Sequence, residues 1–476
     1  MFINFALRVV ELFRDRLIRN ITLTIVTRAV AFVCTVVTAI LVGRYLGPSE
    51  FGKFNFALGF TTLAISITEL MAGTVATREI AKEHQLAQQH LSSLFGARLI
   101  SVLVAIILVL ICAVFIHDKV TQVLLLLAML QLPCWVFQSS EVWYVAIINL
   151  TLPNLFRVIS HSLLLFLTVS FISAGMGVRW LMMAQVLSLW VYSLLTYFAT
   201  RRSVRFGMPS IKAAFSLLYR SFVFGVAHIV WRLHLQSPLV LAYLVCGSFQ
   251  AGLLAAALKF VAIADWSISV FILSLYPAMS EVLHDTSLFK RRFISGMATM
   301  CAFGASITVL IASCNETLMH LTFGRSFAMA GDVLLALAPT FVLLFLLSHI
   351  GHAFIALEGQ RQYFLSGCVS VLCTLMFVSS LGHLGGALGA ASGLSIASLV
   401  GLCASILMLH RMNADLLSSQ RLLLKVVVTC IIIAVALVCG WWVHGVVLEL
   451  AIGLALSLVA LLIWVNVNID SSSHST

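Results

Sequence analysis

The chain has 476 residues, of which 62% are hydrophobic and 9% charged, and its formal net charge is +11. Soluble domains average roughly 45–50% apolar and about 25% charged residues, so the composition excludes soluble enzymes, nucleic-acid-binding proteins and disordered scaffolds. The mean hydropathy is +1.11 and the apolar runs are long and continuous. They indicate an all-α polytopic membrane protein, because the strands of an outer-membrane barrel would alternate apolar and polar residues.

Residues 1–20 carry a polar stripe that recurs every three or four positions: Asn4, Arg8, Glu11, Asp15 and Arg19. The other faces of a helix with this spacing are apolar. Such a helix lies in the plane of the lipid headgroups, so the sequence predicts an interfacial amphipathic leader. A simple leader helix is an equally good reading of the same pattern.

A helix that crosses a membrane needs about 20 apolar residues. Fourteen segments meet this length and are predicted to be transmembrane helices: 23–45, 52–74, 95–116, 122–148, 153–174, 178–199, 221–245, 250–275, 294–314, 332–357, 362–382, 386–408, 424–444 and 447–467. Only the short stretch from Trp442 to Gly445 divides the last two segments, which leaves open whether both cross the membrane. A polar tail, 468–476, follows them.

The distribution of Lys and Arg predicts the orientation. If the N-terminus is cytoplasmic, the inner segments hold eighteen of these residues, the outer segments five, and the spans themselves another five. Cytoplasmic loops carry the excess of Lys and Arg. Both termini are therefore expected to be cytoplasmic, in a multi-pass membrane protein.

An internal repeat relates residues 41–60 to residues 241–260 without a gap. Six of the twenty pairs are identical: Leu41/Leu241, Gly47/Gly247, Gly52/Gly252, Ala57/Ala257, Leu58/Leu258 and Phe60/Phe260. Both copies join an outward span to an inward span through a glycine-bounded turn, and six spans lie between them. This is the parallel repeat of two-lobed transporters.

The repeat predicts a division of the chain into lobes. The expected parts are a leader at 1–20, an N-lobe of six helices at 21–200, a cytoplasmic linker at 201–220, a C-lobe of six helices at 221–410, two further helices at 411–467 and the tail at 468–476.

The segment Arg44-Tyr-Leu-Gly-Pro-Ser-Glu-Phe-Gly-Lys-Phe54 resembles the signature turn of the Wzx-type polysaccharide-transport flippases. Their superfamily also holds the multidrug (MATE) exporters and the peptidoglycan-lipid flippase. Further matching segments are Gly252-Leu-Leu-Ala-Ala-Ala-Leu-Lys259, Phe323-Gly324, Ala356-Leu-Glu-Gly-Gln-Arg361 and Leu384-Gly-Gly-Ala-Leu-Gly-Ala390. The likeness covers nearly the whole chain.

The resemblance implies a V-shaped bundle of two six-helix lobes. It also implies a substrate, a polyprenyl-pyrophosphate-linked oligosaccharide such as an O-antigen or exopolysaccharide repeat unit, which is moved across the inner membrane by alternating access. The implied partners are this substrate, the membrane lipids, and a polymerase and a ligase that act later. No nucleic acid, cofactor, metal or catalytic residue is expected.

Five cationic side chains fall inside predicted spans, where each costs about 2.5–3.5 kcal/mol at a helix centre. Arg98 and Arg157 lie close enough to cytoplasmic ends to snorkel to water, and this is the favoured reading of both. Arg28 is deeper, and Arg232 and Lys259 lie near the middle of their spans. These three are predicted to line a wet cavity, with a structural ion pair as the alternative.

A cationic cavity suits an anionic head group, because Arg and Lys both hold phosphate oxygens. The resemblance places Arg28 at the first-span arginine of the peptidoglycan-lipid flippase and Lys259 at the lysine of the family's eighth span. Arg232 joins them from its depth alone. Arg157 and His228 complete the predicted substrate contacts, His228 because the repeat pairs it with Arg28.

Three acids in the spans are candidates for ion coupling. Asp265 has no basic partner on its own helix face, so it either pairs with another helix, for example through Arg232, or carries an exchangeable proton. Glu69 and Glu141 are expected to pair with Arg28 or Arg157.

Two other functions remain as alternatives. A multidrug exporter would hold cations with cavity carboxylates, but here the bases in spans outnumber the acids five to three. A membrane polysaccharide polymerase or ligase would carry sizeable outer loops, and the longest outer segment here is the short stretch at 315–331.

Overall fold

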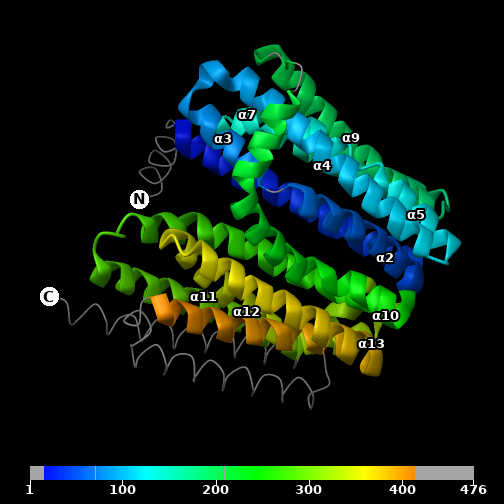
Figure 1. Cartoon of the computed structure of the whole chain (residues 1–476). Coiled ribbons are helices and arrows are strands. Elements are labelled where there is room, and N and C mark those ends of the chain that lie inside the picture. Colours follow the sequence, from blue (N-terminus) through cyan, green and yellow to red (C-terminus); the bar gives the residue numbers. More distant parts are fainter. Residues whose placement is uncertain (1–15, 70, 205, 208–209, 413–476) are drawn as a thin grey trace, which may run out of the picture. The chain divides into compact units, whose positions relative to one another are not determined.

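The computed structural model of the protein describes residues 16–412 except 70, 205 and 208–209 (Figure 1). Every regular element within these residues is helical. The α-helices are α2 (Arg16–Glu69), α3 (Ala72–Lys82), α4 (Ala87–Phe115), α5 (Lys119–Met129), α6 (Cys134–Phe137), α7 (Glu141–Ala146), α8 (Thr151–Ser173), α9 (Val178–Ser203), α10 (Ile211–Ser280), α11 (Thr286–Phe323), α12 (Ala330–Ala356) and α13 (Gln360–Met412). Three short 3-10 helices join them: η1 (His84–Leu86), η2 (Gln138–Ser140) and η3 (Arg325–Phe327).

In the part of the chain that the structure describes, nine helices are long and apolar enough to cross a membrane. Three of them, α2, α10 and α13, each contain two predicted spans that meet at non-helical glycines: Gly47, Gly247, and Gly385 with Gly386. The nine helices therefore account for the twelve spans predicted between residues 23 and 408, and the all-α membrane architecture is confirmed. The spans predicted at 424–444 and 447–467, the tail and most of the leader lie outside the described residues.

The fourth predicted span, 122–148, is a broken helix instead of a continuous one. It consists of α5, α6, η2 and α7, and Pro133 stands at its first break. Proline has no N–H to donate and its ring collides with the preceding turn, which ends the ladder of backbone hydrogen bonds. The freed carbonyl of Leu130 instead accepts a hydrogen bond of 2.9 Å from Trp190 Nε1. Non-helical backbone at membrane depth is tolerated where it is buried in protein or lines a cavity.

The two copies of the sequence repeat adopt the same turn. Gly47 has φ 68° and ψ 174°, and Gly247 has φ 84° and ψ 175°. These φ values lie in the left-handed region that glycine enters without steric cost. The glycine-bounded turn predicted for both copies is confirmed.

The two turns also contact each other reciprocally within the second compact unit. A Cβ on Gly52 would collide with the carbonyl oxygen of Ser248, and a Cβ on Gly252 would collide with that of Pro48. The hydroxyls of Ser49 and Ser248 are hydrogen-bonded at 3.0 Å. Glycine at both repeat positions therefore lets two backbones pack in direct contact, which is how small residues act in membrane helix packing.

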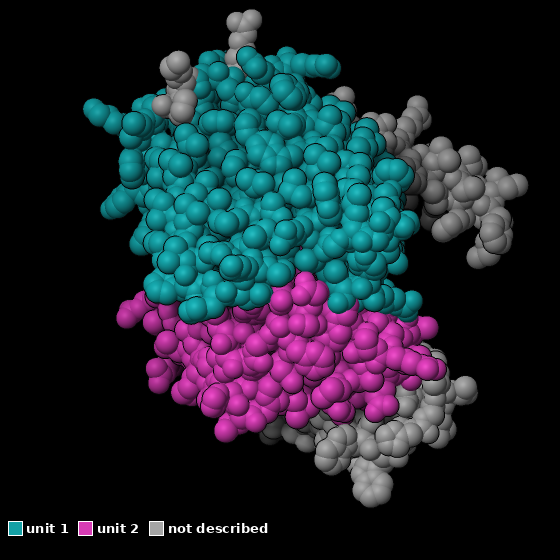
Figure 2. All heavy atoms as spheres, turned by 90° about the vertical axis from the view of Figure 1, so that its right-hand side faces the viewer, with its two compact units in different colours: residues 1–46, 56–229 teal, residues 47–55, 230–476 magenta. Residues whose placement is uncertain are grey.

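The chain divides into two compact units, drawn in different colours in Figure 2: residues 1–46 with 56–229 in the first, and residues 47–55 with 230–476 in the second. Each described unit has an apolar core of its own. In the first unit Ile80 and Leu94 are fully buried. In the second unit Phe293 and Ile350 are fully buried.

The connection between α9 and α10 is short. Helix α9 extends to Ser203 and α10 begins at Ile211, so both ends of the predicted linker 201–220 are helical. The backbone N–H of Gly207 donates a hydrogen bond of 2.8 Å to Ser92 Oγ, which ties the connection to α4. The lobe boundaries drawn from the repeat stay a prediction.

Candidate functional site

A cavity of about 450 Å³ lies within the first unit, beside the broken helix. It is lined by Gly73, Thr74, Thr77, Arg98, Trp135, Gln138, Glu141, Val142, Val145, Arg157, Ser160, His161, Leu189 and Tyr192. Ligand pockets usually enclose roughly 300–1,000 Å³, and broken helices in transporters commonly form the substrate site. Size and backbone geometry both make this cavity the candidate substrate site of the first unit.

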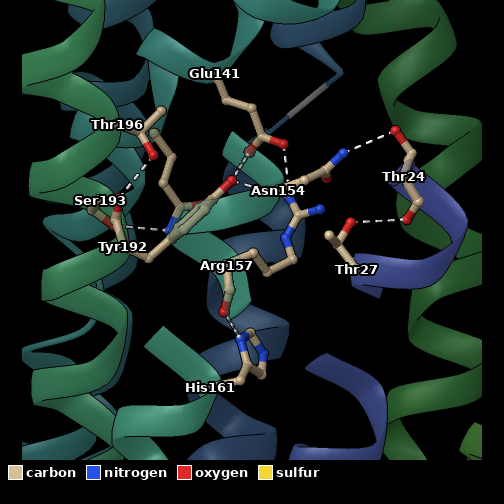
Figure 3. A network of polar contacts seen from close by, with 10 residues as sticks. Thr24, Thr27, Glu141, Asn154, Arg157, His161, Tyr192, Ser193 and Thr196 are labelled. Carbon is tan, nitrogen blue, oxygen red and sulfur yellow. Dashed lines mark hydrogen bonds and ion pairs between the residues drawn. The ribbon is translucent and has the colours of Figure 1, made fainter. Parts of the chain in front are cut away.

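An ion pair and a phenol form the polar centre of this cavity (Figure 3). Arg157 Nη2 on α8 donates to Glu141 Oε1 on α7 at 2.7 Å and to the hydroxyl oxygen of Tyr192 on α9 at 3.0 Å. The Tyr192 hydroxyl donates to Glu141 Oε2 at 2.6 Å. Three helices are thereby joined by charge-assisted bonds, which are about twice as strong as neutral ones. The expected pairing of Glu141 with Arg157 is confirmed.

Arg28 on α2 belongs to the same charged group. It interacts electrostatically with Arg157, unfavourably, and with Glu141, favourably. A hydrogen bond of 2.8 Å from Asn154 Nδ2 to Thr24 Oγ1 joins α8 to α2 one turn away (Figure 3). The guanidinium groups of Arg28 and Arg157 repel each other because both are positively charged. An anionic ligand would relieve that repulsion.

Arg98 and Arg157 do not snorkel, which corrects the sequence-based reading. The whole residue Arg98 is only 8% exposed, and its Nη1 donates to the carbonyl of Trp135 at 3.2 Å. The side chain of Arg157 is 22% exposed and is held by Glu141. The broken helix offers polar partners inside the unit, so neither guanidinium has to reach the membrane surface.

Lys259 occupies a separate site in the second unit. Its Nζ donates to Asn55 Oδ1 at 2.8 Å and lies 6.0 Å from the centre of the Phe51 ring. Asn55 is 3% exposed, and its Nδ2 donates to the Phe51 carbonyl at 2.9 Å. Among the described residues no carboxylate interacts with Lys259, so its charge is held by an amide oxygen and an aromatic face alone.

Arg232 and Asp265, both on α10, attract each other electrostatically in the second unit. Asp265 also lines a smaller cavity of about 130 Å³ together with Trp231, His352 and Tyr363. The sequence indicates Arg232 as one possible partner for this acid, and the structure shows that the two residues interact. Asp265 therefore has a basic neighbour, and its role in ion coupling stays a prediction.

The histidines differ in their surroundings. His228 is half-buried on α10, in the part that belongs to the first unit. His234 is fully buried, with ring nitrogens 2.7 Å from Thr374 Oγ1 and 3.3 Å from Ser398 Oγ. His349 Nε2 lies 3.0 Å from the carbonyl oxygen of Phe293. The last two are hydrogen-bonded core residues.

The structure thus brings Arg28, Arg157 and Glu141 together in the first unit. It places Arg232, Lys259 and Asp265 in the second unit. Glu69 ends α2, and its side chain lies outside the described part.

Residue spacing alone had not indicated Tyr192 or Asn55, because the partners of each come from helices far away in the sequence. Trp135 lies in the predicted span 122–148, and nothing in the residue spacing there distinguishes it from other tryptophans in the predicted spans.

These features define a membrane transport protein. Long apolar helices surround a polar cavity, and charged groups stand at membrane depth, where they mark substrate or ion pathways. The model of the family described as polysaccharide biosynthesis protein matches residues 17–283. The chain belongs to this family.

Solved structures support the fold. The first is a lipid II flippase, MurJ, in an inward closed conformation, with a TM-score of 0.73 at 15% identity over 94% of this chain and 100% of that chain. The second is a multidrug resistance MATE family transporter of the MOP superfamily, inward-facing, with a TM-score of 0.67 at 14% identity over 83% of this chain and 99% of that one.

A third is a MOP superfamily transporter from Pyrococcus furiosus, with a TM-score of 0.56 at 14% identity over 86% of this chain and 99% of that one. None of the curated proteins matches the chain. The protein therefore has the fold of the flippases and exporters of this superfamily, and its family assigns it to polysaccharide biosynthesis.

Proposed function

We propose that the protein is a flippase for a polyprenyl-pyrophosphate-linked oligosaccharide, an O-antigen or exopolysaccharide repeat unit. It moves this substrate from the cytoplasmic to the periplasmic face of the inner membrane by alternating access. The observation that carries the proposal is Lys259, a cation in a membrane-crossing helix that no described carboxylate neutralises. A protein that keeps such a charge at membrane depth has a functional reason to do so.

The pyrophosphate is the part of the substrate that this charge suits. Lys is a compact point charge with three donors, and among the described residues Lys259 makes one hydrogen bond, to Asn55. The other two N–H groups are available to phosphate oxygens. We assign Arg28 and Arg232 to the same anionic group, with Arg157 and His228 as further contacts to the substrate.

A multidrug exporter shares the fold but would need carboxylates to hold lipophilic cations. Glu141 is already paired with Arg157, and Asp265 faces Arg232. Each acid thus has a basic neighbour within the protein, which favours an anionic substrate. Asp265, Glu69 and Glu141 remain our candidates for coupling transport to an ion.

The orientation that we propose has both termini in the cytoplasm, so that Lys119 lies on the periplasmic side and Lys212 on the cytoplasmic side. In a variant without native cysteines, a membrane-impermeant maleimide added to intact cells should label Lys119→Cys and leave Lys212→Cys unlabelled. Labelling at position 212 alone would reverse the topology and, with it, the direction of transport.

The function is tested by deleting the protein from cells that make the glycan. We expect the lipid-linked oligosaccharide to accumulate on the cytoplasmic face, where added periplasmic glycosidases in spheroplasts cannot reach it, and surface glycan to disappear. A polymerase or ligase defect would instead leave single units accessible from the periplasm. Accessible units in the deletion strain would therefore contradict the proposed flippase.

A further inference from the structure

The three cations that we assign to the pyrophosphate do not line the first unit's cavity. Lys259 and Arg232 belong to the second unit, and Arg28 is not among the described residues that surround the cavity. With about 450 Å³, the cavity is large enough to take a ligand group of its own. A part of the substrate other than the pyrophosphate is therefore expected to enter it.

The polar centre of the cavity has hydrogen-bond acceptors and donors side by side (Figure 3). Each oxygen of Glu141 accepts one bond, from Arg157 or from Tyr192, and a carboxylate oxygen can accept two. Within the described chain, Arg157 donates only through Nη2, which leaves Nε–H and Nη1–H as donors. A hydroxyl group donates and accepts at the same time, so it can bond to the carboxylate and the guanidinium together.

Neutral groups of the lining match the same kind of ligand. The Nε2 of Gln138 donates to Ser193 Oγ at 3.1 Å, and the amide oxygen of Gln138 is a further acceptor. The Nε1–H of Trp135 is buried, and no described residue accepts its hydrogen bond. Buried donors are normally satisfied, and a ligand hydroxyl supplies the acceptor. The Trp135 ring, Val142 and Val145 add apolar surface.

A pyranose without a charged group combines these features. Its hydroxyls donate and accept around the edge of the ring, and one ring face consists of C–H groups that pack on an aromatic side chain. A carboxylate or a phosphate only accepts hydrogen bonds, so it can use the donors of Arg157 but not the acceptors of Glu141. Its negative charge would also be repelled by the Glu141 carboxylate.

We propose that the first unit's cavity binds an uncharged pyranose of the head group, with the sugar hydroxyls on Glu141, Arg157 and Tyr192 and the C–H face of the ring against Trp135. This assignment rests on the proposed flippase function and divides the substrate into two parts: the cavity takes the sugar, and Lys259 takes the pyrophosphate. Because the polar contacts come from three joined helices, the positions of the sugar hydroxyls decide which glycan is accepted.

The test uses the full-length protein in lipid nanodiscs and follows ligand binding by saturation-transfer NMR. The probes are the methyl glycosides of glucose, galactose and mannose, the methyl glycosides of the corresponding uronic acids, and inorganic pyrophosphate. We expect at least one uncharged glycoside to bind, and its uronic acid to bind about two- to tenfold more weakly, the range of one hydrogen bond. Glu141→Gln, which removes the repelling charge, should abolish that difference.

Trp135→Phe keeps a ring and removes the N–H, so it should weaken binding of the uncharged glycoside by about two- to tenfold. Trp180→Phe, at a tryptophan of α9 that is 52% exposed, is the matched control and should leave binding unchanged. Pyrophosphate should not displace the glycoside, and Lys259→Ala should lose pyrophosphate binding only.

The sugar site would be overturned if no uncharged glycoside binds, if Trp135→Phe leaves its binding unchanged, or if pyrophosphate displaces it. Tighter binding of the uronic acids would also overturn it, because the cationic lining residues Arg98 and Arg157 would then set the charge of the ligand. Pyrophosphate binding that ignores Lys259→Ala would instead count against the phosphate assignment. Glycoside binding that depends on Trp135 would stand even if the deletion strain contradicted the flippase.

Discussion

Replacing Lys259 by methionine should abolish most glycan export and at the same time make the protein more stable. Methionine fills a similar volume without charge, and the ammonium has only Asn55 and the Phe51 ring to replace its water shell. Desolvation of an ion costs more than one such bond returns, so the thermal unfolding temperature in detergent should rise. A hydrogen bond to a charged group contributes about 1.5–3 kcal/mol, so we expect export to fall about 10- to 100-fold.

The control variants separate charge from packing. Lys259→Arg keeps the charge and should keep much of the export, and Lys212→Ala, at an exposed residue of α10, should change neither quantity. Export is measured as surface glycan, normalised to the amount of protein in the membrane. A well-expressed Lys259→Met variant that exports like the natural protein would show that Lys259 does not contact the substrate.

The sequence predicted the helices well because two signals agree along most of the chain. Apolar runs of about 20 residues define the spans, and glycines mark the turns between them. The turn at Gly47 and the turn at Gly247 could be aligned because both need a backbone conformation that glycine adopts readily. A local steric requirement of this kind can be recognised from the residue type at that position.

The broken fourth span could not be predicted with the same method. The run around Pro133 is as apolar as any other span, and hydropathy does not report whether the backbone inside it is helical. The break is compensated by tertiary contacts, such as the bond from Trp190 to the Leu130 carbonyl. This contact joins residues that are 60 positions apart. Analysis of local patterns in one sequence does not predict which distant residues meet.

The charged residues show the same division between local and tertiary information. The depth of Lys259 in its span was readable, and the structure adds its amide partner Asn55. The position of Arg98 near a span end suggested snorkelling, whereas the structure buries it against the broken helix. Depth along a helix is a local property, but the direction in which a long side chain turns depends on its neighbours.

Breaking the ion pair of the first unit should have the largest effect on stability. Arg157→Ala leaves the half-buried carboxylate of Glu141 with the Tyr192 hydroxyl as its hydrogen-bond partner among the described residues. Removing one member of a buried pair costs about 3–5 kcal/mol. Because both side chains are 22% exposed, we expect the lower end, about 3 kcal/mol. The variant should accumulate poorly in the membrane and unfold at a lower temperature. The exposed pair Arg292–Glu281 is the control, and Glu281→Gln should have little effect.

The double variant Glu141→Gln with Arg157→Gln distinguishes a structural pair from a functional one. Two amides can hydrogen-bond to each other and to Tyr192, so no uncompensated charge remains and abundance should return close to that of the natural protein. Export should stay low, because the substrate would lose the guanidinium donors and the carboxylate acceptor together. If surface glycan instead recovers along with abundance, the pair only joins α7, α8 and α9. The selectivity of transport would then have to come from other charged side chains of the first unit, such as Arg28.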